Sequence, residues 1–106
     1  MRPVLPGDVR AAALALMAVP RQERMAAFEA ILARAEAADR YRKRLGRVHP
    51  AWGDGTLAAA AGPGAAEPLA DDPAYLDATL HVLTRLAHRR GIAPPALPLY
   101  GRAPMW

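Results

Sequence analysis

The hydrophobic positions recur most regularly in the segment RQERMAAFEAILARAEAADRYRKRLGR, residues 21–47. Three- and four-residue spacings place its large apolar side chains on one face of a helix: Met25, Phe28, Ile31 and Leu32. Pro20 suits the first turn of this helix, and Gly46 is a natural C-terminal stop. The pattern therefore predicts a helix over residues 20–45, roughly 39 Å long at ~1.5 Å per residue.

A second amphipathic segment, PAYLDATLHVLTRLAHRR, covers residues 73–90. Its apolar face carries Leu76, Leu80 and Leu83, which recur at helical spacing. Asp72 can cap the start of this helix, with Pro73 at the first helical position, and Gly91 can end it. The sequence predicts a second long helix here.

The remaining segments up to residue 91 predict shorter elements. Asp8 can cap a short helix that stops before Pro20, and Asp54 or Thr56 can cap the short helix LAAAA after a structured turn around Trp52. Residues 62–72 have the composition of a flexible link. Because no segment has a clear period-two pattern, we predict an all-α fold in which the two long helices form an antiparallel hairpin with the first short helix packed on it.

The last segment, IAPPALPLYGRAPMW, is not typical of a helix because it contains four prolines. We therefore divide the chain into a helical domain, residues 1–91, and an extended tail, residues 92–106. The tail is too apolar for a solvated linker, so its large side chains predict a docking peptide, a strap onto a neighbouring subunit, or a strap back onto the chain's own hairpin. These side chains are Leu97, Leu99, Tyr100 and Trp106.

Composition favours an oligomer. Hydrophobic residues make up 53% of the 106, but 26 of these 56 residues are alanine, which leaves few large side chains for a monomeric core. We therefore expect the apolar faces of the two long helices to hold the hairpin and neighbouring subunits together. The predicted interface residues are Met25, Phe28, Ile31, Leu32, Leu76, Leu80 and Leu83.

Several classes of function lack sequence support. The chain has no cysteine and no serine, its three histidines lack metal-ligand spacing, and it has no glycine-rich phosphate loop followed by lysine. His49 and Asp54 share a loop, but a turn histidine and a capping aspartate explain them better than an acid–base pair. We expect a non-enzymatic protein without cofactor or metal. It has no membrane span or signal peptide, so we also expect it to be soluble and cytoplasmic.

Positive charge is concentrated in the first half of the chain. Residues 1–53 carry ten Lys and Arg against five Asp and Glu, whereas residues 54–106 carry four against five. Five cations fall within eight residues at the end of the first long helix: Arg40, Arg42, Lys43, Arg44 and Arg47. This cluster predicts contact with phosphates without the geometry to read bases, although cations that complement a helix C-terminus are the structural alternative.

The order of these parts resembles the small terminase of bacterial gene transfer agents, phage-like particles that package host DNA. The resemblance rests on MRPVLPGDVRAAALALMAVP, the helix RQERMAAFEAILARAEAADRYRKR and the motif GRVHPAWGDGTLAAAA, which together cover residues 1–61. It implies a non-enzymatic bacterial protein that assembles as a ring, binds double-stranded DNA and delivers it to the large terminase. Only 19 residues precede the long helix, too few for the helix-turn-helix domain that phage small terminases commonly carry.

Without that domain, the resemblance implies weak, sequence-independent DNA binding with a steep salt dependence. The competing interpretation is a helical adaptor or regulator that binds only protein and uses its basic residues for solubility.

Overall fold

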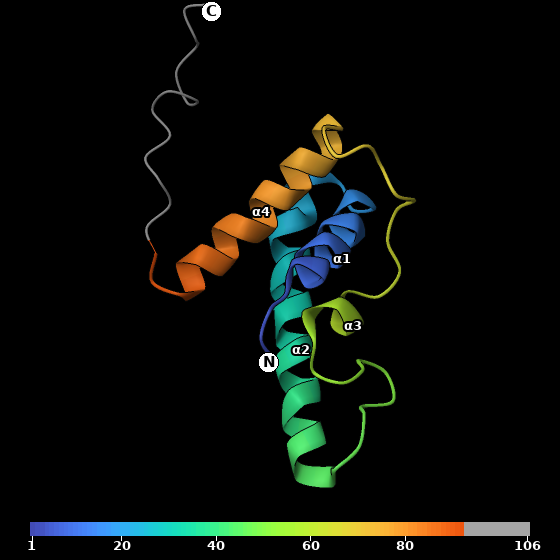
Figure 1. Ribbon diagram of the computed structural model, residues 1–106, viewed down its shortest axis with the longest axis vertical. Coiled ribbons are helices and arrows are strands. Elements are labelled where there is room, and N and C mark those ends of the chain that lie inside the picture. The colour runs from blue at the N-terminus through green and yellow to red at the C-terminus, as the bar shows by residue number, and fades with distance from the viewer. Residues whose placement is uncertain (93–106) are drawn as a thin grey trace, which may run out of the picture.

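The computed structural model describes residues 1–92 (Figure 1). Its helices are α1 (Pro6–Met17), α2 (Arg24–Leu45), α3 (Leu57–Ala61) and α4 (Pro73–Arg89), with a 3₁₀ turn, η1 (Arg21–Glu23), before α2. Within residues 1–92 there is no strand, only an isolated bridge between His49 and Gly53. The all-α prediction is therefore confirmed for the described part of the chain. None of its helices is both long enough and apolar enough to span a bilayer.

The start of α1 is fixed by Asp8, although not in the way the sequence predicts. The helix begins at Pro6, so Asp8 lies inside the first turn and is not the N-cap. Its Oδ2 accepts a hydrogen bond from the Leu5 N–H (2.8 Å), and its Oδ1 accepts one from the Ala58 N–H at the start of α3 (2.9 Å). One buried carboxylate therefore stabilises the beginnings of two helices.

The core lies where α1, α2, α3 and α4 converge. Much of it is alanine, and small side chains allow the helices to approach closely. Figure 1 shows α1 and α3 on the same side of α2, and α1 packs extensively against both α3 and α4. The buried apolar residues that form this core cluster are Ala12, Ala13, Leu16, Phe28, Ile31, Leu32, Ala35, Leu57, Ala60, Ala78 and Val82.

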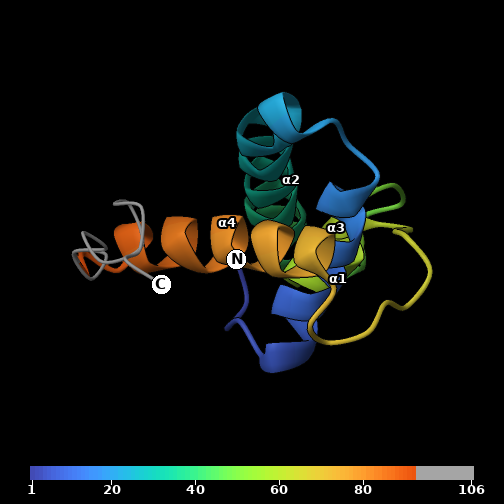
Figure 2. The same ribbon diagram turned by 90° about the horizontal axis from the view of Figure 1, so that it is seen from above.

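The predicted antiparallel hairpin of the two long helices is not seen. Helices α2 and α4 run in the same sense and cross each other, with α1 packed against α4 (Figures 1 and 2). Three ion pairs follow the same order along both helices: Arg24–Asp77, Glu29–Arg85 and Glu36–Arg89. The reason is the path of residues 46–72, which return past α3 to the beginning of α2 before α4 starts.

The link after α3 makes specific contacts with α1, although its composition predicts flexibility. The Ala65 N–H donates to the Leu14 carbonyl (3.0 Å), and Glu67 pairs with Arg10. A Cβ on Gly64 would lie 2.6 Å from the Leu14 carbonyl carbon, so only glycine fits this approach. The predicted tail falls almost wholly outside the described residues.

Candidate nucleic-acid interface

The predicted basic cluster lies at the C-terminal end of α2 and just beyond it. The helix ends at Gly46, whose φ of 67° is left-handed and whose N–H donates to the Arg42 carbonyl (2.8 Å). Arg42, Lys43 and Arg44 occupy the last turn, where their charges complement the helix dipole. These three cations therefore complement the C-terminus of α2, which is the structural alternative to phosphate binding.

Two of the five cations are held by a buried carboxylate that the sequence prediction missed. Asp39 is 3% exposed and pairs with Arg42 and Lys43 at 3.0 Å each, and with the Met1 amino group at 3.3 Å. Hydrogen bonds from Lys43 and Arg42 hold the pKa of Asp39 well below its usual range. Arg42 and Lys43 consequently have less free charge to offer a ligand than their positions suggest.

The other three cations, Arg40, Arg44 and Arg47, remain available. All three are exposed, and within residues 1–92 none has a carboxylate oxygen within 4.0 Å of its guanidinium. Arg40 and Arg44 are four residues apart on one helix face and line a groove of about 440 Å³ together with Tyr41, Leu45 and His49. These three arginines form the surface best suited to phosphates, and we call them the free arginines.

The loop of residues 49–53, which we call the aromatic loop, adjoins the free arginines. The loop closes through reciprocal backbone hydrogen bonds between His49 and Gly53 (2.9 and 3.1 Å). The His49 ring meets Tyr41 edge-on, with centroids 4.8 Å apart, and stacks on Trp52 with centroids 4.6 Å apart and planes 4° from parallel. The sequence predicts a structured turn around Trp52, but it does not place the Trp52 ring beside the basic cluster.

His49 and Asp54, the possible acid–base pair, both accept hydrogen bonds from neighbouring residues of this loop. His49 Nδ1 accepts hydrogen bonds from the backbone N–H groups of Ala51 and Trp52, both at 3.0 Å. Asp54 Oδ1 accepts from the Thr56 hydroxyl (2.8 Å) and N–H (3.1 Å), which keeps the pKa of Asp54 below its ordinary value. Thr56 in turn caps α3. Both side chains therefore stabilise the loop that carries Trp52.

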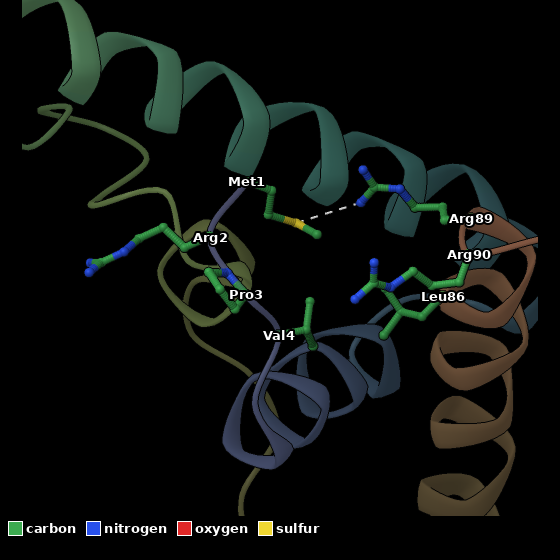
Figure 3. Close-up of a pocket in the computed structure, with 7 residues that line it drawn as sticks. All are labelled: Met1, Arg2, Pro3, Val4, Leu86, Arg89 and Arg90. Atoms are coloured by element: carbon green, nitrogen blue, oxygen red, sulfur yellow. Dashed lines mark hydrogen bonds between the residues drawn. The ribbon is translucent and has the colours of Figure 1, made fainter.

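A second basic hollow, which sequence reasoning did not find, lies between the N-terminal segment and the end of α4. Figure 3 shows Arg89 and Arg90 directed toward Met1 and Val4, while Arg2 points away. Arg89 is engaged by Glu36 and by the Met1 sulfur (3.8 Å), which leaves less of its charge for a ligand. The hollow measures about 580 Å³ and is lined by Met1, Arg2, Pro3, Val4, Leu86, Arg89 and Arg90.

The predicted subunit interface divides into buried and exposed residues. Phe28, Ile31 and Leu32 are at most 5% exposed and belong to the core of the single chain, so they offer no surface to a neighbouring subunit. The structure corrects their assignment from interface to core. The others are exposed. Met25 on α2 is 69% exposed. On α4 the buried face carries Ala78 and Val82, which leaves Leu76 (45%), Leu80 (59%) and Leu83 (48%) exposed.

The exposed side chains Met25 and Leu80 border a groove of about 690 Å³ where α4 crosses α2. The groove also reaches Phe28, Thr84 and His88. The predicted docking residues Leu97, Leu99, Tyr100 and Trp106 lie outside the described residues. Among residues 1–92, no group of three or more histidine and acidic side chains is placed to hold a metal ion.

Residues 2–86 match the model of a protein family described as a domain of unknown function, DUF7742, and the chain belongs to that family. No curated protein and no solved structure shows significant similarity to the chain.

Proposed function

We propose that this member of the DUF7742 family is a non-enzymatic DNA-binding subunit that serves as the small terminase of a gene transfer agent. In this proposal it oligomerises, binds double-stranded DNA without sequence preference and delivers it to the large terminase. The observation that carries the DNA-binding part is the group of free arginines, three exposed guanidinium groups without a carboxylate partner in the described part of the chain. The assignment to a packaging machine rests on the resemblance over residues 1–61.

Guanidinium groups on one rigid helix end suit phosphate oxygens. The expected binding is weak for one subunit and falls steeply with salt, with a log–log slope of about −0.9 per phosphate contacted. Unrelated duplexes of equal length should bind equally.

The DNA test replaces the three free arginines with glutamine: Arg40→Gln, Arg44→Gln and Arg47→Gln. Arg42 and Lys43 stay intact because their replacement would also remove two of the three cationic partners of the buried Asp39. The matched control removes the same charge from exposed arginines elsewhere: Arg10→Gln, Arg21→Gln and Arg34→Gln.

Duplex affinity should drop and its salt slope should flatten in the free-arginine variant, with much smaller changes in the control. Equal losses in both variants would mean that net charge alone causes binding. Unchanged affinity in the free-arginine variant would remove the proposed surface.

Self-association is expected through Met25, Leu76, Leu80 and Leu83, which form an apolar surface on α4 and the start of α2. Native mass spectrometry should show an oligomer that Leu80→Gln weakens. Leu69→Gln, at a 78% exposed position in the link, is the control and should leave it unchanged. A sharp wild-type monomer at micromolar concentration would contradict the ring.

The tail is tested by deleting residues 97–106. We expect the truncated chain to keep its helical content and its oligomer but to lose binding to a large terminase. Loss of the oligomer instead would assign the tail to strapping neighbouring subunits.

A protein-binding adaptor without DNA binding is the second candidate. The observation that favours it is the groove between α2 and α4, whose exposed apolar side chains, Met25 and Leu80, suit a protein side chain or helix. The adaptor would show duplex binding that is negligible at low salt, together with a monomer that binds a protein partner through this groove.

A further inference from the structure

The aromatic loop holds Trp52 in a fixed orientation at the protein surface. One ring face packs on His49, and reciprocal backbone bonds between His49 and Gly53 close the loop beneath it. A Cβ on Gly53 would lie 2.5 Å from the Ala59 Cβ, so the loop sits directly against α3. Trp52 nevertheless remains 37% exposed. The fold thus presents part of a large, flat and pre-oriented aromatic ring to solvent.

His49 joins this ring to the basic surface. The same imidazole that stacks on Trp52 lines the groove with Arg40 and Arg44. A ligand lying in the groove would therefore meet two guanidinium groups and the His49 ring, and Trp52 adjoins the groove through its stacking on His49. A duplex could contact only the cations of this surface, through its phosphates. Its paired bases are stacked inside the double helix and cannot reach an aromatic ring.

We propose that this surface prefers single-stranded DNA, with an unpaired base stacking on Trp52 while adjacent phosphates contact Arg40 and Arg44. Exposed aromatic rings beside a positive groove are the two elements by which proteins bind single strands without reading sequence. The inference rests on the proposed DNA-binding function and specifies the form of DNA that the same site takes. Unpaired bases at opened or cut ends of a duplex present the same chemistry.

The test separates bases from phosphates. Full-length protein carrying Trp106→Phe leaves Trp52 as the single tryptophan and hence as a fluorescent reporter at the site. The probes are a short oligo-dT and an abasic strand with the same number of phosphates. Oligo-dT should quench Trp52 and bind on the order of ten-fold more tightly, whereas the abasic strand should bind weakly and leave the emission unchanged. Equal affinities with no quenching would overturn the inference.

Variants at position 52 provide the second measurement. Trp52→Leu keeps an apolar side chain in the loop but has no ring, so the preference for oligo-dT over the abasic strand should disappear. Trp52→Phe keeps a ring and should restore most of the preference. Retention of the full preference in Trp52→Leu would refute stacking at this residue. The fluorescence result on native Trp52 stands even where a variant disturbs the loop.

Failure of this inference can be told apart from failure of the proposed function. Duplex binding that depends on the free arginines, with no preference for bases over an abasic strand, would overturn the single-strand inference alone. Duplex binding that survives loss of the free arginines would overturn the assignment of this surface to DNA.

Discussion

The strongest stability prediction concerns Arg24, a charged residue that is only 8% exposed. Its Nε donates to the Leu16 carbonyl (2.9 Å) and the Val19 carbonyl (3.2 Å) at the end of α1. Its Nη1 donates to Asp77 Oδ2 on α4 (3.0 Å). One guanidinium at the start of α2 therefore joins three helices. Arg24→Met keeps the aliphatic stem but removes every one of these bonds.

The expected loss of stability in Arg24→Met depends on how far Asp77 is left without a partner. Breaking a buried, hydrogen-bonded charge pair costs about 3–5 kcal/mol. The Asp77 side chain is 28% exposed and retains Arg21 at 3.1 Å, so water and a second cation offset part of the loss. We therefore expect Arg24→Met to lower the free energy of unfolding by about 3 kcal/mol, near the bottom of that range. The melting temperature should fall by roughly 10 °C or more.

Arg21 provides the control, because it pairs with the same carboxylate at nearly the same distance but its side chain is 75% exposed. Exposed ion pairs contribute about 0–1 kcal/mol, so Arg21→Met should cost little. Both variants are measured by denaturant unfolding at one fixed protein concentration. Similar losses for the two, or a loss below about 1 kcal/mol for Arg24→Met, would refute the reasoning that burial decides the effect.

Three further changes test the junctions of the fold by thermal or denaturant unfolding. Gly55→Ala should lower the free energy of unfolding by at least about 1–3 kcal/mol, because φ is 94° and the new Cβ would lie 2.8 Å from the Asp39 Cβ. Gly7→Ala is the control: the space around Gly7 is open, so this change should be neutral or slightly stabilising. Asp8→Ala removes hydrogen bonds that cap the beginnings of two helices, and each cap contributes about 0.5–2 kcal/mol to stability. A decrease in the free energy of unfolding of less than about 0.5 kcal/mol would contradict the shared cap. The depressed pKa of Asp39 means that its stabilising contribution is complete above about pH 4 and is lost as pH falls below that value, so Asp39→Asn should flatten the acid limb of the stability profile.

Local signals predicted the starts of α3 and α4 and the end of α2, but not the start of α1. Asp72 accepts hydrogen bonds from two N–H groups at the start of α4, Thr56 caps α3, and Gly46 ends α2. These features depend on a few neighbouring residues, so they can be inferred without knowledge of the fold. The relative sense of α2 and α4 depends instead on the path of residues 46–72, for which the sequence offered only a turn and a link of unknown direction.

The burial of two charged residues of α2, Arg24 and Asp39, was missed because a charged residue on a helix normally faces water. A signal was nevertheless present. Arg24 lies four residues before Phe28, and Asp39 follows Ala38, so both fall in register with the apolar face of α2. A charge in such a position must find partners inside the fold. Extending the apolar face to both ends of α2 would have predicted that Asp39 pairs with the cations one turn later.

The two proposed surfaces lie toward opposite ends of α2. Met25 is in its first turn and the free arginines begin at Arg40, with Arg44 roughly 28 Å from Met25 at about 1.5 Å per residue. If the apolar surface joins subunits, DNA affinity gains from several basic ends acting together, although none of the free arginines lies on the apolar surface. Leu80→Gln should then weaken duplex binding without changing the affinity of a single subunit for a short duplex that only one basic surface can contact. A direct effect on that short duplex would mean that the two surfaces are not independent.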